Sequence, residues 1–157
     1  MEAQIIQTIM GMIAAACFAV LFGIRDRKLA WIAAGSGAGW AVYLICLGLG
    51  HGMYWGLFWA SLFVAALSEV LARIVKTPVI LLLVPMLIPE FPGKDLYYTM
   101  YYLVRKHYED FANTSNMVLL EAGAIAMGII LASCAAKLTW SITAHVARGQ
   151  NDTHCKR

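Results

Sequence analysis

Residues 88–100 read Ile-Pro-Glu-Phe-Pro-Gly-Lys-Asp-Leu-Tyr-Tyr-Thr-Met and interrupt a run of Val, Ile and Leu. A proline removes an amide donor and clashes with the preceding helical turn, so two prolines and a glycine predict a broken helix. A helix that starts again after such a break presents unpaired amides and the positive end of its dipole. We expect the amides of Lys94, Asp95 and Leu96, with the Lys94 ammonium, to attract a substrate carboxylate.

This break supplies the candidate substrate-binding residues, which are Pro89, Pro92, Gly93, Lys94 and Tyr97. One alternative is a simple Pro-Gly turn at the membrane surface, with the tyrosines forming an interfacial belt. In another, the carboxylate of Asp95 itself occupies the helix start and takes the place of a bound anion. The sequence leaves these alternatives open.

Glu69, Arg73 and Glu121 are candidates for coupling or ion pairing, because they lie inside otherwise apolar runs. A charge at a helix centre costs about 2.5–3.5 kcal/mol on insertion scales, and the apolar residues around Glu69 offset about that amount. An intramembrane carboxylate could carry a coupling proton or contact a substrate ammonium. The alternative for Glu69 is an ion pair with Arg73 one turn away. Glu121 lies nearer the end of its run, where we expect a carboxylate at the surface.

The other reactive residue types form no recognisable site. Cys17, Cys46, Cys134 and Cys155 contain no CxxC pair, and three of them lie in apolar runs, which favours packing over metal or disulfide chemistry. We find no nucleophile–base pair, phosphate loop or metal-ligand cluster in the sequence. An enzyme is therefore not expected, nor is a metal or another cofactor. No basic stripe interleaved with aromatic residues indicates nucleic-acid binding.

The composition indicates a membrane protein. Hydrophobic residues make up 61% of the 157 residues, charged residues make up 13%, and the mean hydropathy is +0.70. Soluble domains have roughly 45–50% apolar and about 25% charged residues. Residues 3–24 and 29–50 each contain no charged residue and exceed the roughly 18 residues that a spanning helix needs.

The elements that must position the candidate residues are therefore membrane helices. Strong apolar segments cover residues 3–24, 29–50, 52–75 and 116–145. Small residues recur every four positions in several of them, which lets helix backbones approach closely in lipid. Packing within one bundle explains most of these rows, and a partner subunit or a second copy of the chain could use a remaining face. We predict one transmembrane helical domain over residues 1–146 and a short polar tail over 147–157.

Residues 78–104 decide the number of crossings. Residues 78–92 alone would span only about 22 Å, short of the roughly 30 Å hydrocarbon core. We therefore predict an all-α integral membrane protein with about five transmembrane helices, the fourth broken at the Pro-Gly motif. The alternative is four helices and a re-entrant segment. Basic residues place the loops near 25–28 and 73–76 in the cytoplasm, together with the tail that carries Arg148, Lys156 and Arg157.

Residues 85–100 resemble the signature of the small subunit of the threonine/serine exporter family, in the form IPxFPGxxxYYTM. The stretches Gly39-Trp40-Ala41-Val42-Tyr43 and Ser68-Glu69-Val70-Leu71-Ala72-Arg73 are also similar to that family, so the resemblance covers most of the chain. Those small subunits correspond to the C-terminal membrane half of single-chain exporters.

The resemblance implies a multi-pass protein of the bacterial cytoplasmic membrane that works with a larger partner subunit. It implies threonine and serine as substrates, with small carboxylic acids such as dicarboxylates also assigned to split members, and transport driven by an ion or proton gradient. On that analogy this chain alone is not the complete exporter. The competing function is a non-transporting membrane scaffold that assembles a partner.

Overall fold

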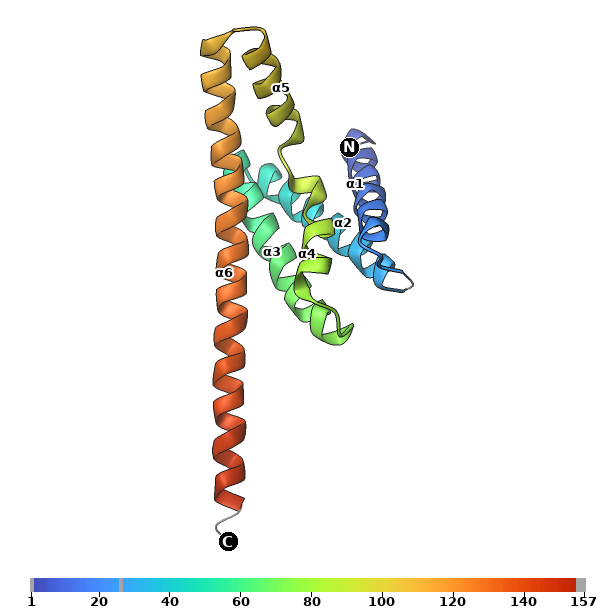
Figure 1. Ribbon diagram of the computed structural model, residues 1–157, viewed down its shortest axis with the longest axis vertical. Coiled ribbons are helices and arrows are strands. Elements are labelled where there is room, and N and C mark those ends of the chain that lie inside the picture. Colours follow the sequence, from blue (N-terminus) through green and yellow to red (C-terminus); the bar gives the residue numbers. More distant parts are fainter. Residues whose placement is uncertain (1, 26, 155–157) are drawn as a thin grey trace.

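The computed structural model describes residues 2–25 and 27–154, with side chains described for 4–25 and 27–139. These residues form six α-helices and one 3-10 turn, and no strand occurs in the described part of the chain (Figure 1). The elements are α1 (Glu2–Leu21), α2 (Arg27–Gly48), α3 (Met53–Ile74), α4 (Val79–Met86), η1 (Ile88–Glu90), α5 (Gly93–Val104) and α6 (Tyr108–His154). The predicted all-α fold is confirmed.

Four of the described helices are long and apolar enough to cross a membrane, and they correspond to the four predicted segments. They are α1, α2, α3 and the part of α6 from Tyr108 to Thr139. The helix α6 is longer than the predicted segment 116–145 at both ends. Its first turns are polar, but they pack against α5, and this tertiary contact extends the helix beyond its apolar run. Residues 155–157, which include the predicted cytoplasmic Lys156 and Arg157, lie outside the described residues.

The helix break predicted between residues 89 and 93 is present. The helix α4 has 8 residues and α5 has 12, and the 3-10 turn η1 lies between them. At about 1.5 Å per residue, neither helix alone reaches across a hydrocarbon core of roughly 30 Å. In Figure 1 the chain runs upward through α4, η1 and α5 without turning back. The segment therefore runs in one direction on both sides of the break, and α4 and α5 are not among the four helices of spanning length.

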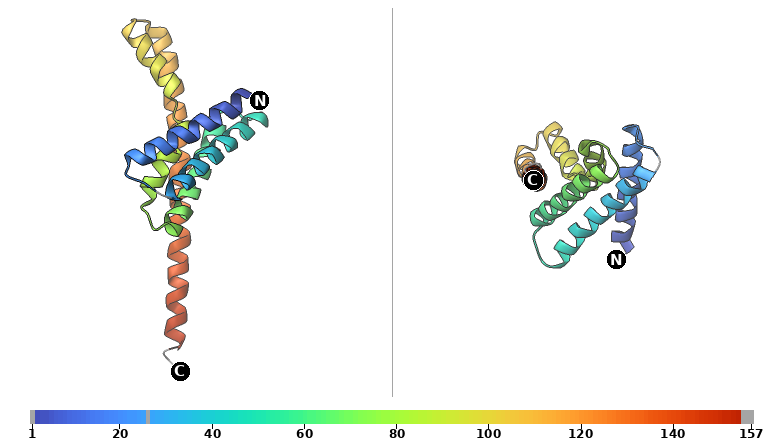
Figure 2. Two further views of the ribbon diagram at one scale, coloured as in Figure 1. Left: turned by 90° about the vertical axis from the view of Figure 1, so that its right-hand side faces the viewer. Right: turned by 90° about the horizontal axis from the view of Figure 1, so that it is seen from below.

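The chain reverses direction at each loop between long helices but keeps one direction from α4 to α5, and the described N- and C-terminal ends lie toward opposite ends of the molecule (Figure 1). The loop after α1 and the loop after α3 lie on the same side, because Lys28 Nζ donates a hydrogen bond of 2.9 Å to Thr77 Oγ1. This contact agrees with the shared location that the basic residues predict for both loops. The α5–α6 hairpin rises beyond the ends of α1, α2 and α3 (Figure 2).

Left-handed residues end several helices. After α1, Gly23 has φ 75°, its amide donates to the Val20 carbonyl at 2.9 Å, and the Ile24 amide donates to the Ala19 carbonyl at 3.0 Å. These two bonds form a Schellman motif that pairs carbonyls at the end of the helix. Lys106 repeats the left-handed conformation after α5, with φ 60°, and turns the chain directly into α6.

The predicted rows of small residues pack inside the bundle. Ala15 and Ala19 of α1 are fully buried. A Cβ added at Gly35 of α2 would lie 2.8 Å from Met86 Cε, and one added at Gly128 of α6 would lie 2.8 Å from the Phe58 carbonyl oxygen of α3. The absence of side chains at these positions therefore sets the distance between helices.

Candidate functional site

A cavity of about 270 Å³ lies at the helix break. It brings together residues from α2, from the start of α3, from η1 through the start of α5, and from α6. These residues are Trp40, Tyr43, Met53, Leu57, Pro89, Glu90, Phe91, Pro92, Lys94, Asp95 and Glu121. Its volume is close to the lower end of small-molecule sites, which begins at about 300 Å³.

The break itself is held in place by close packing. The ring of Pro89 lies against Gly11 of α1, where an added Cβ would be 3.1 Å from Pro89 Cγ. The helix α5 starts at Gly93, after Pro92 in the N-cap position. The expected set of open amides is partly wrong, because the Leu96 amide donates to the Pro92 carbonyl at 3.0 Å. The amides of Lys94 and Asp95 donate to no other backbone group among the described residues.

Glu121 is not a surface carboxylate, and this corrects the expectation drawn from its position in the sequence. It is 0% exposed, and neither carboxyl oxygen has a hydrogen-bond partner within the described part of the chain. The extra helical turns at the start of α6 move Glu121 away from the helix end and onto the cavity wall. The Asp95 carboxyl lies close enough for its negative charge to act on Glu121.

Glu90 is a second buried carboxyl on the cavity, and the sequence analysis did not select it. It ends the η1 turn, is 3% exposed, and has no hydrogen-bond partner for either oxygen among the described residues. A Cβ added at Gly39 of α2 would lie 2.8 Å from Glu90 Oε1. The signal that could have identified Glu90 is its place between two prolines, at the centre of the predicted break.

The cavity also contains hydrogen-bond donors. The indole nitrogen Nε1 of Trp40 is buried and has no partner in the described part of the molecule. The Lys94 side chain lines the same cavity and is exposed. Burial of a polar group without a hydrogen-bond partner costs free energy, so the Trp40 indole N–H and the two buried carboxyls favour the binding of a polar molecule.

The ionisable groups of the cavity are mainly acidic. Glu90, Asp95 and Glu121 face one base, Lys94. Carboxylates suit an ammonium group or a proton, whereas the indole N–H and the lysine suit a carboxylate or a hydroxyl. The arrangement therefore matches a small molecule that carries both an ammonium and a carboxylate group.

The predicted substrate-binding residues are placed in three ways. Pro89, Pro92 and Lys94 line the cavity. Gly93 lies beside Pro92 on the wall of a neighbouring apolar pocket of about 410 Å³ between α5 and α6. Tyr97 is 66% exposed and lies on the outside of α5. Its position matches the interfacial alternative for the tyrosines better than a contact with the cavity.

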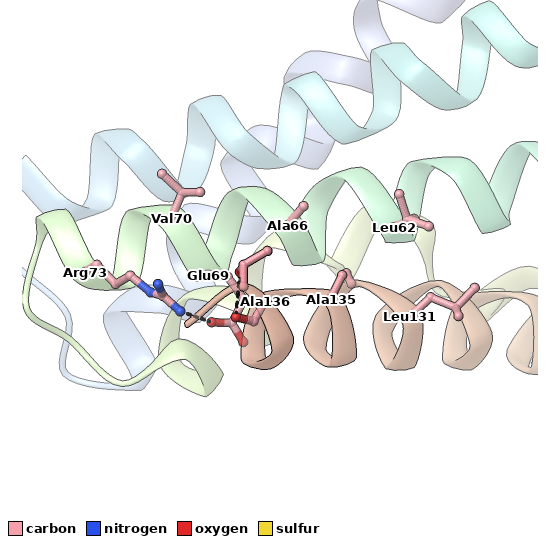
Figure 3. Close-up of a pocket in the computed structure, with 10 residues that line it drawn as sticks. Leu62, Ala66, Glu69, Val70, Arg73, Leu131, Ala135 and Ala136 are labelled. Carbon is pink, nitrogen blue, oxygen red and sulfur yellow. Dashed lines mark hydrogen bonds and ion pairs between the residues drawn. The ribbon is translucent and has the colours of Figure 1, made fainter. Parts of the chain in front are cut away.

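Glu69 and Arg73 occupy a separate place, a groove of about 540 Å³ between α3 and α6 (Figure 3). Arg73 Nη2 lies 3.6 Å from Glu69 Oε2, and their side chains are 40% and 16% exposed. The ion pair that the sequence offered as the alternative for Glu69 is therefore formed. The groove is otherwise lined by apolar side chains and Thr139.

Potential metal ligands do not cluster in the structure as described. Over residues 4–25 and 27–139, no group of three His, Cys, Asp or Glu side chains is arranged to hold a metal ion. Glu90, Asp95 and Glu121 share a cavity but do not form such a group.

The four helices of spanning length, the break between α4 and α5 and the buried carboxyls define a multi-pass helical membrane protein with a polar cavity in its bundle. The chain belongs to the threonine/serine exporter family, because the family model described as "Threonine/Serine exporter, ThrE" matches residues 7–135. This is a family of transporters and not of enzymes. The matched region contains the helix break, the cavity and the Glu69–Arg73 pair. Comparisons with curated proteins and with solved structures gave no match.

Proposed function

We propose that this chain is a membrane subunit of a gradient-driven exporter of small amino acids, with threonine and serine as the first candidates. In this proposal it acts in the bacterial cytoplasmic membrane together with a larger partner subunit. Family membership supports export and the substrate class. The partner rests on the resemblance of residues 85–100 to small subunits of split exporters.

The observation that carries the proposal is the buried carboxyl of Glu121, which has no hydrogen-bond partner among the described residues and lines the cavity at the helix break. In the bound state Glu121 and Asp95 accept hydrogen bonds from the substrate ammonium. The Trp40 indole N–H and the Lys94 ammonium donate to the substrate carboxylate. A bound zwitterion thus satisfies groups of both signs, and this lowers the desolvation penalty that the empty cavity carries.

The same charge balance favours an amino acid over a dicarboxylate. A dicarboxylate would bring two negative charges to a cavity with three acidic residues and one lysine. Like charges at short distance in a poorly solvated site repel strongly, so such a substrate would require several of these carboxyls to be protonated.

Transport by cells that lack both subunits tests this proposal. Cells loaded with labelled threonine should export it only when this chain and the larger partner are expressed together, and neither protein alone should restore export. Labelled succinate, tested in parallel, should leave the cells at the background rate.

Export by this chain alone would contradict the subunit assignment. Export of succinate without threonine would contradict the amino-acid assignment. If co-expression restores neither substrate although both proteins are in the membrane, the scaffold function replaces the transport function.

A further inference from the structure

Glu90 is the buried carboxyl that the proposed substrate contacts leave unused. It ends the η1 turn, and η1 contacts α1, α2 and α3 in addition to α4. We propose that Glu90 binds the coupling proton, and that this proton decides whether the α4–α5 break stays packed against α2. The coupling part rests on the proposed export function, whereas the conformational part concerns this chain alone.

The first argument is the fit of Glu90 against α2. Its Oε1 atom lies where a Cβ of residue 39 would approach to 2.8 Å, so only glycine at position 39 leaves room for the carboxyl. The Val64 side chain of α3 also lies close to the position of that Cβ. Neither carboxyl oxygen of Glu90 has a hydrogen-bond partner among the described residues. An ionised carboxylate is costly in such surroundings, whereas a neutral carboxyl fits there at a much lower cost.

The second argument is where an ionised Glu90 would find partners. The Lys94 ammonium and the Trp40 indole N–H line the cavity beside it. Loss of the proton therefore favours movement of Glu90 away from Gly39 and toward the cavity. Residues 87–92 between α4 and α5 contain only a short 3-10 turn, so this movement does not require a long helix to unwind.

The charged neighbours of Glu90 on the cavity come from α5 and α6. From α2 it is faced by Trp40 and Tyr43, from α5 by Lys94 and Asp95, and from α6 by Glu121. From α3, Leu57 lines the same cavity and Val64 lies close to Gly39, and α1 contributes Gly11 against the neighbouring Pro89. Asp95 and Glu121 also titrate, so a test must separate them from Glu90.

The proton step is a simple association. A carboxylate oxygen of Glu90 forms an O–H bond with a proton taken from water on one side of the membrane. The same bond breaks when the proton is released to water on the other side. No bond of the substrate forms or breaks, and no group is oxidised or reduced.

Hydrogen exchange of the purified full-length chain in lipid nanodiscs tests the conformational step. Exchange of the amides in residues 87–96 is measured by mass spectrometry at about pH 5 and about pH 9, which brackets carboxyl titration in proteins. After correction for the intrinsic pH dependence of exchange, the unmodified chain should exchange about tenfold faster at the higher pH, because the segment opens. Glu90→Gln, which stays neutral, should be protected at both pH values.

Two further variants keep the test decisive. Glu121→Gln changes the other buried carboxyl of the cavity and should keep the pH response of residues 87–96. Glu90→Asp retains an ionisable group and should also keep the response, so it serves if Glu90→Gln does not fold. Protection of α3, measured in the same samples, reports folding.

A pH response that persists in Glu90→Gln, or that disappears in Glu121→Gln, overturns the proposal. So does an unmodified chain whose break exchanges equally at both pH values. None of these results depends on transport, so failure here is distinguishable from failure of the export function.

Discussion

Glu69 and Glu121 both lie within membrane-length helices, but the two carboxylates have different surroundings. Glu69 pairs with Arg73 one turn further along α3 and lines a groove that is otherwise mostly apolar. Glu121 has no hydrogen-bond partner among the described residues and faces a cavity shared with Glu90, Asp95 and Lys94. A carboxylate that already forms an ion pair within its own helix is a weak candidate for binding a ligand. A buried carboxylate without a hydrogen-bond partner is the stronger candidate for function.

The largest expected effect comes from Glu121→Gln. Removal of this charge should leave the substrate ammonium without its main partner, and we expect export to fall about 100-fold, the equivalent of about 2.7 kcal/mol. Export is measured per molecule of membrane-inserted protein. The matched control is Glu109→Gln, which changes an exposed carboxylate in the first turn of the same helix and should export normally. Equal export by both variants would remove the distinction between the two kinds of carboxylate.

The second effect concerns the break that brings Glu90 to the cavity. The double change Pro92→Ala, Gly93→Ala should join η1 to α5 as continuous helix, because proline and glycine are the least favourable helix residues. A Cβ at residue 93 meets no atom within 4 Å, so the alanine fits. We expect normal abundance and at least about a tenfold loss of export, since the cavity depends on the interrupted helix. The control is Gly52→Ala, because a Cβ at residue 52 also meets no atom within 4 Å. If the double variant is less abundant but its export per inserted molecule is unchanged, the break is only a surface turn.

An intermediate effect should appear in stability, where the α3–α6 contact acts through packing. A Cβ at residue 128 would lie 2.8 Å from the Phe58 carbonyl oxygen and 2.9 Å from the Leu62 nitrogen, and neither backbone atom can move aside easily. Gly128→Ala should therefore destabilise the bundle by about 1–3 kcal/mol. Gly123→Ala on the same helix meets open space and should be neutral. The folded fraction in an SDS titration compares the two, and equal stability would show that α6 does not pack on α3 as described.

The smallest effect is expected at Glu69. An ion pair between residues one helical turn apart contributes about 0.3–0.5 kcal/mol. The double change Glu69→Gln, Arg73→Met removes both charges together, so we expect export to change less than about twofold. Normalised export and abundance measure this result. Loss of export in the double variant, with normal abundance, would indicate that Glu69 has a coupling role and would contradict the contrast drawn between Glu69 and Glu121.

The features that the sequence predicted are those that depend on local pattern. Apolar runs of spanning length predicted α1, α2, α3 and most of α6, and the prolines predicted the break between α4 and α5. The Glu69–Arg73 pair follows from a spacing of four residues on one helix. Each of these depends on neighbours in the chain.

The composition of the cavity could not be predicted in the same way. Glu121 was placed at a surface because its apolar run starts only a few residues earlier, and the packing of α5 on α6 moved it inside. Glu90 and Trp40 share the cavity although they are far apart in the sequence. Their meeting depends on the glycines at positions 11 and 39, which let η1 lie against α1 and α2. Such contacts between distant helices produce no periodic pattern in the amino-acid sequence, so they could not be predicted from it.

The length of α6 has a mechanical consequence. Its 47 residues contain no proline, so the helix has no built-in hinge of that kind, and at about 1.5 Å per residue it is about 70 Å long against a hydrocarbon core of roughly 30 Å. About 50 Å of it lies between Glu121 and His154, at the same rise per residue. A rotation of about 5° about Glu121 would move that distant end by about 4 Å, as a lever arm does. Binding at the cavity could thus be converted into displacement well outside the lipid.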